Sequence, residues 1–197
     1  MGTIGPQSAE AGEGFLQGKL LIAMPGMPDP RFERSVIFMC AHSADGAMGI
    51  IVNKPIENLA FRDLMHTLDI RVTSNMPGGP VLYGGPMSTK RGYVLHSAEY
   101  VAGESTLPVT DDVALTGTVD ILRAIAEGRG PQQSIFALGY ASWGPGQVED
   151  EIQNNGWLHC DTDRAIIFDV DLEQRWTRAF QSLGIDVTSL SSDAGRA

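Results

Sequence analysis

The chain has 197 residues, of which 43% are hydrophobic and 19% are charged, and its 14 basic and 24 acidic residues give a formal net charge of −10. This length is enough for one well-buried domain, and the negative charge disfavours direct nucleic-acid binding, because phosphate contacts supply most of the nonspecific affinity. The apolar run at residues 20–24 is too short to span a bilayer, and the only cysteines are Cys40 and Cys160. We therefore expect a cytoplasmic protein with two free thiols and no membrane association.

Composition divides the chain into three segments. Residues 1–14 are rich in Gly, Ser, Ala and Glu, which predicts a disordered N-terminal segment. Residues 185–197 are rich in Ser and predict a flexible C-terminal tail. Residues 15–184 between them predict a single domain.

Three short apolar runs predict strands in the first part of the chain, at residues 20–24, 36–42 and 48–52. The segment 25–30 lies between the first two and contains three prolines. Its backbone suits neither a helix nor a central strand, so we expect a loop there.

An amphipathic helix is predicted next. Phe61, Leu64, Met65 and Leu68 fall at i, i+3, i+4 and i+7, the spacing of one helix face. Asn58 precedes this pattern and is a candidate N-cap.

The middle of the chain predicts strands at residues 81–83 and 93–96 and a hairpin over residues 105–116 that turns at two adjacent aspartates. A helix over residues 119–126 follows, because its apolar residues share one face and glycines come directly after it.

The last part of the chain predicts a strand at residues 135–140, a helix at 148–154, a strand at 165–170 and a helix at 172–183. In total this is about seven or eight strands and about four helices in mixed order, which indicates an α/β or α+β class. The spacing is too irregular for a plain doubly wound fold.

Several motifs in this order resemble the YqgE/AlgH family of bacterial proteins. They are residues 20–25, 32–37, 46–55, 84–86, 91–96 and 139–147, with Glu151 and Asn155. The resemblance implies a mixed α+β fold in which a mixed, largely antiparallel sheet bends into a partial barrel with helices packed outside. It implies little about function, since the family is mostly uncharacterised and some members are labelled transcriptional regulators. The family pattern often has Gly where Ser142 stands, which weakens a role for this hydroxyl as a nucleophile.

The segments 48–55 and 138–145 also resemble each other weakly, since each begins with an apolar residue and Gly and has Pro at the same offset. Chance explains such a short match. If the repeat is real, the two turns flank one cleft, with Asn53 and Lys54 facing Ser142 and Trp143.

The glycine-rich turn at residues 139–147 is the first place to look for chemistry. A nucleophile elbow needs Gly two residues before its Ser, and Tyr140 occupies that place before Ser142. Spacing does not select a base among His42, His66, His96 and His159. The simpler interpretation is a turn serine that bonds its own backbone.

Phosphate and metal sites are also disfavoured. Glu149, Asp150 and Glu151 occupy the positive end of the helix after the turn and would repel an anion. We expect Cys40 and His42 on one strand face, but a zinc site needs three or four converging ligands. We therefore expect no metal and no cofactor.

The four carboxylates Asp161, Asp163, Asp169 and Asp171 fit turns and caps better than a magnesium site. Asp171, three residues before Gln174, has the spacing of a capping box.

Aromatic and amide side chains around the same turn suggest a binding site for a small polar ligand or a protein. In the simpler alternative, Trp143 and Trp157 only pack the ends of the helix at 148–154. The candidate binding residues are Asn53, Lys54, Gly84, Gly85, His96, Tyr140, Ser142, Trp143, Gln147 and Asn155.

Two classes of function follow. The first is a non-enzymatic binding or regulatory protein with an unknown protein or small-molecule partner. The alternative is an enzyme or small-ligand-binding protein with a cleft near residues 139–147, in which Asn53, Lys54, His96, Ser142 and Trp143 would converge.

Overall fold

The computed structural model describes residues 15–74, 76 and 78–193, so the predicted disordered segment 1–14 lies outside the described residues. Within them, ten strands form one sheet with the order β10-β1-β2-β3-β9-β6-β8-β7, and β4 and β5 join it through β9. The strands are β1 (Lys19–Ala23), β2 (Val36–Ser43), β3 (Gly46–Ile51), β4 (Pro55–Ala60), β5 (Pro80–Tyr83), β6 (Met87–Ser97), β7 (Thr106–Pro108), β8 (Val113–Thr116), β9 (Ser134–Trp143) and β10 (Trp157–Asp161).

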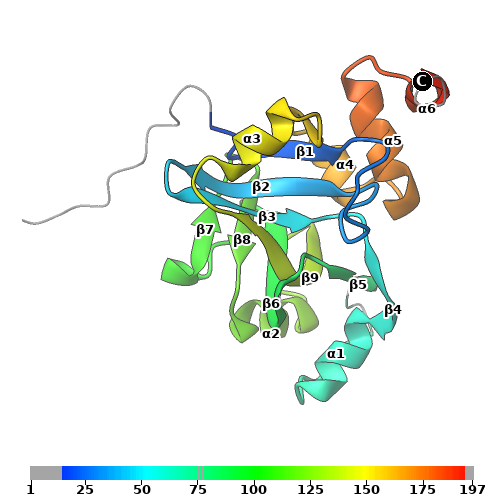
Figure 1. Cartoon of the computed structure of the whole chain (residues 1–197). Coiled ribbons are helices and arrows are strands. Elements are labelled where there is room, and N and C mark those ends of the chain that lie inside the picture. The colour runs from blue at the N-terminus through cyan, green and yellow to red at the C-terminus, as the bar shows by residue number, and fades with distance from the viewer. Residues whose placement is uncertain (1–14, 75, 77, 194–197) are drawn as a thin grey trace, which may run out of the picture.

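The sheet is curled into a half-barrel, which confirms the predicted fold class. Neighbouring strands are antiparallel except for β5 and β9, which are parallel. Figure 1 shows β2 and β3 running across the view while β6 and β8 run steeply down it. The strand β9 crosses diagonally between these two sets and connects them.

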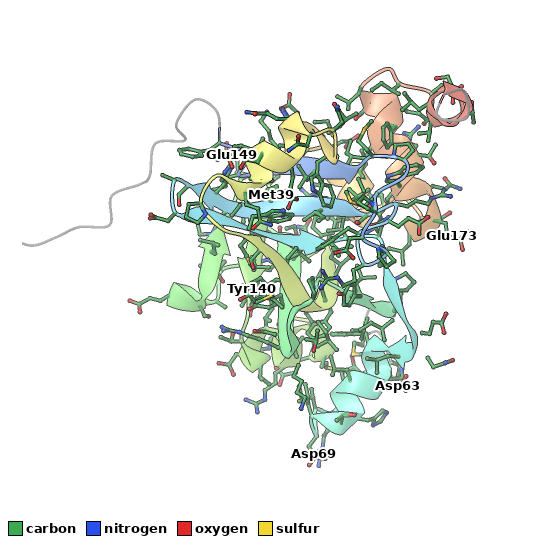
Figure 2. All side chains as sticks on the ribbon, viewed as in Figure 1. Met39, Asp63, Asp69, Tyr140, Glu149 and Glu173 are labelled. Atoms are coloured by element: carbon green, nitrogen blue, oxygen red, sulfur yellow. The ribbon has the colours of Figure 1, made fainter. Side chains whose placement is uncertain are left out.

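Six α-helices in the described part of the chain pack around the sheet. They are α1 (Phe61–Thr67), α2 (Val119–Ala126), α3 (Gln147–Gln153), α4 (Arg164–Phe168), α5 (Leu172–Ser182) and α6 (Val187–Asp193). In Figure 1, α3, α4 and α5 lie around β1 and β2, while α1 and α2 lie at the other end. The same separation is visible in Figure 2, where the labelled Glu149 on α3 and Asp69 beyond α1 mark opposite ends of the molecule.

The bend in β9 depends on close backbone approach at Gly139. This residue has φ 77°, and a Cβ on it would overlap the carbonyl oxygen of Gly85 and lie 2.9 Å from that of Met87. Before the bend β9 pairs with β5 and β6, and after it β9 pairs with β3. Glycine is required because an L side chain at this φ is strained and has no space.

Most predicted elements are present, but the predicted strand at residues 165–170 is wrong, since these residues form α4. The Asp163 carboxylate accepts a hydrogen bond from the Ala165 amide at 2.9 Å and so caps the helix start. Ile166 and Ile167 are then buried in the core. The last strand is instead β10, which pairs with β1 along its whole length.

Two smaller predictions also need correction. Asn58 is not an N-cap: it lies in β4 with φ 58°, and α1 begins after Ala60. Asp171 does occupy the N-cap position of α5, but its side chain makes no capping hydrogen bond. The described part of the segment predicted as a flexible tail contains α6, and Ile185 and Val187 there pack on the core.

Candidate functional site

A groove of about 640 Å3 lies beside the end of β9. Four segments build it: the loop between β1 and β2, the start of β6, the end of β9, and α3 with the turn that follows it. Its lining side chains are mainly Met, Pro and aromatic. They include Met24, Pro25, Met27, Pro28, Phe32, Pro86, Met87, Trp143 and Trp157, with Asp29, Arg31, Ser142, Gln147, Glu151, Asn154 and Asn155 as the polar members.

The strand β9 brings two predicted residues into this groove. It continues into the predicted turn as far as Trp143 and pairs with β3, with Ser142 opposite Met48 and Trp143 opposite Ala47. Ser142 is exposed and Trp143 is buried, as expected for alternation along a strand. The turn itself is shorter than predicted, and Gly146 with φ 73° forms the N-cap of α3.

The Glu151 carboxylate organises the groove wall. Its Oε2 accepts hydrogen bonds from the indole Nε1 of Trp143 at 3.0 Å and of Trp157 at 2.8 Å. Its Oε1 accepts one from Gln147 Nε2 at 2.9 Å, and Gln147 Oε1 in turn accepts one from the Gly144 amide at 3.0 Å. The two indole rings therefore lie edge to face, with centroids 6.1 Å apart.

The opposite wall is the loop between β1 and β2. Asp29 and Arg31 form a two-pronged ion pair, with Arg31 Nη2 at 2.7 Å and Nε at 3.0 Å from the Asp29 carboxylate. The Arg31 hydrogen bond lowers the pKa of Asp29. The Phe32 ring packs edge-on against Trp157, with centroids 5.6 Å apart, and so connects the loop to the far wall.

Four of the predicted binding residues line the groove: Ser142, Trp143, Gln147 and Asn155. Two others brace the loop from behind. Asn53 accepts a hydrogen bond from the Val36 amide at 2.8 Å. Lys54 donates one to the Arg31 carbonyl at 3.0 Å, and burial lowers its pKa.

The remaining predicted residues lie elsewhere. Gly84 bridges two strands, because its carbonyl accepts from the Ile51 amide and its amide donates to the Leu138 carbonyl. Gly85 packs against the backbone of β9 at the bend. Tyr140 packs edge-on against Tyr93, and His96 is fully buried in the half-barrel.

The proposed cleft between the two similar turns is not present. In the antiparallel pair of β3 and β9, Gly49 lies opposite Ala141 and Ala47 opposite Trp143. The turn at Asn53 follows the end of β3, whereas the turn after Trp143 meets its beginning. Asn53 and Lys54 therefore do not face Ser142 and Trp143.

Within the described residues, no histidine is hydrogen-bonded to Ser142. His42 accepts from the Leu16 amide and bonds Glu149 at 2.9 Å. His96 bonds the Ser97 carbonyl and the Thr116 hydroxyl, and burial lowers its pKa. Among residues 15–74, 76 and 78–193, Ser142 therefore has no hydrogen-bonded histidine that could act as its base.

Cys40 and His42 do not share a strand face as predicted. A register shift between Met39 and Ala41 interrupts the alternation of β2. Cys40 is buried in the core with Phe38, while the His42 ring packs against Phe15, with centroids 5.0 Å apart. Burial raises the pKa of the Cys40 thiol well above its usual range.

Sequence reasoning missed most of the apolar lining and the central role of Glu151. Glu151 follows Gln147 by four residues, a spacing that places both side chains on one face of α3. That spacing was a usable signal. Met24, Phe32 and Met87 carry no local signal, because only tertiary packing brings their segments together.

Comparison with known proteins places this chain. The sequence profile described as AlgH-like matches residues 20–188. The chain belongs to the AlgH-like family. A UPF0301 protein of Bradyrhizobium diazoefficiens is 53% identical over 191 residues, covering 93% of this chain and 89% of the relative. A UPF0301 protein of Caulobacter vibrioides is 51% identical over 184 residues, covering 93% of this chain and 94% of the relative.

A solved AlgH-like structure supports the same fold. The solution structure of the AlgH protein from Pseudomonas aeruginosa matches with a TM-score of 0.76 and 37% identity, covering 95% of this chain and 99% of that one. The names of these relatives state no activity. None of the helices described here has the length and apolar character needed to cross a membrane.

Proposed function

We propose that this AlgH-like protein is a non-enzymatic binding protein whose groove takes an apolar, basic segment of a partner protein. The observation that carries the proposal is the composition of the groove wall, in which methionine, proline and aromatic side chains predominate. Met24, Met27 and Met87 supply flexible, polarizable surface, which suits partner side chains of varied shape. The partly exposed Phe32 ring supplies rigid aromatic area of the kind found in binding hot spots, and the buried indoles of Trp143 and Trp157 support the wall behind it.

Charge defines the partner further. The chain carries a net charge of −10, and the groove contains the Glu151 carboxylate. Three side-chain donors already orient this carboxylate, and a carboxylate has capacity for about one more. A Lys or Arg beside large apolar residues would complement both features.

Such binding agrees with a regulatory role through protein contacts and not through DNA, whose phosphates the negative charge would repel. We place this activity in the cytoplasm, because Cys40 and Cys160 are free thiols and such thiols are typical of a reducing compartment.

The test is selection of a random dodecapeptide phage library on the immobilised full-length protein, followed by fluorescence anisotropy with synthetic peptides. We expect enriched peptides to combine Trp, Phe, Leu or Met with Lys or Arg. Met87→Lys, which removes apolar surface from the groove wall and repels a basic peptide, should weaken their binding by about tenfold or more.

Leu107→Lys is a matched control, because Met87 and Leu107 are each 44% exposed on a strand but only Met87 lines the groove. It should change peptide affinity by less than about twofold. Failure to enrich any shared pattern, or equal losses in both variants, would contradict the proposal.

A small apolar cation is the second candidate ligand, because about 640 Å3 lies within the ordinary range of small-molecule sites. Binding of tryptamine that depends on Met87, together with no peptide enrichment, would favour this candidate over a protein segment.

A further inference from the structure

A second and smaller cavity lies between the start of β9 and α5, and no residue lines both it and the groove. Its volume is about 200 Å3. Most of its lining residues are apolar, Ser134 and backbone groups make part of its wall polar, and Arg175 on α5 is its only charged member among the described residues. The apolar wall includes Phe61, Leu82, Val94 and Phe136.

Arg175 is buried, with 4% of its surface exposed. Its Nε donates a hydrogen bond to the Val170 carbonyl at 2.8 Å, and its Nη1 donates one to the Val52 carbonyl at 2.6 Å. A guanidinium has five N–H donors. Among the described residues, these two bonds are the only ones it makes, so donor capacity remains at the cavity.

No carboxylate in the described part of the chain forms an ion pair with Arg175. Burial lowers its pKa to about 10, while Asp169 and Asp171 act on it from farther away and oppose that shift. Asp169 instead accepts a hydrogen bond from Gln133 Nε2 at 2.7 Å. A buried cation without a contacting anion is costly, so an incoming anion would relieve an existing penalty.

We propose that this cavity binds a small monocarboxylate with a short apolar tail, whose carboxylate pairs with Arg175. The planar guanidinium matches a carboxylate by two parallel N–H···O bonds. The apolar wall accommodates the tail. A dianionic phosphate fits less well, because one cation faces it and Asp169 and Asp171 lie nearby.

The cavity size limits the tail. Apolar protein cavities of about 150 Å3 hold benzene, so a cavity of about 200 Å3 holds a ring of that size or a chain of similar volume. Each methylene that enters should strengthen binding by about fourfold until the space is filled.

A purely structural role makes the opposite prediction. If Arg175 only ties α5 to the end of β3 through Val52 and to its own helix start through Val170, carboxylates should not bind here. The acid and its neutral analogue then distinguish the two roles without any mutation.

The test is a titration of the full-length protein with acetate, butyrate, hexanoate, decanoate and hexanamide at constant ionic strength, followed by backbone NMR and calorimetry. We expect hexanoate to bind at least about tenfold more tightly than acetate and hexanamide. Shifts should concentrate at Val94, Phe136 and Leu172. Equal affinity for the acid and the amide, shifts elsewhere, or no binding would overturn the proposal.

Variants localise the site. Arg175→Met keeps most of the side-chain volume but removes the charge, and Leu172→Trp narrows the cavity while leaving Arg175 in place. Each should weaken hexanoate binding by about tenfold or more. Arg178→Met, on the exposed side of the same helix, should leave it unchanged.

Two further comparisons keep the test decisive. If Arg175→Met does not fold, Leu172→Trp and the comparison of hexanoate with hexanamide still show whether the carboxylate binds in this cavity. Met87→Lys in the groove should not affect hexanoate binding, so this inference can succeed or fail independently of the peptide proposal. Hexanoate binding that survives both Arg175→Met and Leu172→Trp would place the ligand elsewhere.

Discussion

The two halves of β9 line different concavities, and the charged side chain at each concavity has a different set of hydrogen-bond partners. The half after Gly139 lines the groove, where the Glu151 carboxylate accepts three hydrogen bonds from side chains. The half before Gly139 lines the smaller cavity, where Arg175 is held by two backbone carbonyls and contacts no carboxylate among the described residues. Glu151 is therefore oriented by side-chain donors, whereas Arg175 keeps N–H groups that no side chain among the described residues accepts.

The largest expected effect is at the bend that separates the halves. Gly139→Ala should destabilise the protein by about 3 kcal/mol or more, because the new Cβ adopts a strained φ and overlaps the Gly85 carbonyl. Urea denaturation measures the change. Gly128→Ala is the control, since Gly128 has φ 75° but open space around it, and should cost only about 1 kcal/mol. Equal costs would mean that the bend does not depend on close backbone approach.

Next in size is the buried cation. Arg175→Ala should lower the free energy of unfolding by about 3 kcal/mol, because the Val52 and Val170 carbonyls lose their donor and a void remains. Arg175→Met should cost less, since it keeps the packing and removes a desolvated charge. Chemical denaturation of both variants checks the order. A larger loss for Met than for Ala would show that the longer apolar side chain does not pack in the space that Arg175 occupies.

A smaller effect is expected at the groove carboxylate. Glu151→Gln keeps the side-chain shape but replaces one carboxylate oxygen with an NH2 group, which then faces an N–H donor of Gln147 or of an indole. The lost hydrogen bond should lower the free energy of unfolding by about 1–2 kcal/mol. Glu173→Gln, at an exposed site on α5 labelled in Figure 2, should cost less than about 0.5 kcal/mol. Denaturation midpoints give both values. Indistinguishable variants would mean that Glu151 does not organise the wall.

The smallest expected effect is a pH dependence of the free energy of unfolding. It comes from His96 on β6, which lies opposite Ser134 in the first half of β9. Burial lowers its pKa below the usual 6.5, although the Ser97 carbonyl and Glu99 oppose this. The unfolded chain therefore binds the proton more readily. The contribution of His96 to the free energy of unfolding should be complete above about pH 6.5. Below that pH the free energy of unfolding should fall by at most about 1.4 kcal/mol per pH unit.

Comparison with His96→Gln isolates this dependence. The variant loses some stability at every pH, because the bond to Thr116 is disturbed, but its stability should change less between pH 7 and 5.5. Parallel curves for the two proteins would assign the pH dependence to other groups.

Sequence patterns predicted the fold well where the signal is local. The predicted strand at residues 135–140 and the helical spacing at Phe61 and Met65 both correspond to real elements. The error at residues 165–170 came from reading an apolar run as a strand when a single cap, Asp163, makes it a helix. The sequence of β4 has no alternation of apolar and polar residues that would predict a strand. It begins at Pro55 and contains Asn58, whose φ is positive.

The candidate site was predictable only in part, for the same reason. Ser142, Trp143, Gln147 and Asn155 are close in sequence and share the groove. Asn53 and Lys54 were assigned to the same cleft by a weak repeat, but strand direction places them at the other end of β3. The opposite wall comes from segments more than a hundred residues away in sequence, whose approach depends on the whole sheet.

The most direct test of the binding proposal is methyl NMR of methionine-labelled protein during titration with a selected apolar, basic peptide. The chain has eight methionines, of which Met24, Met27 and Met87 line the groove. The proposal predicts that these three methyl signals shift while those of the buried Met39 and Met65 do not. Binding that leaves the three signals unchanged would contradict it.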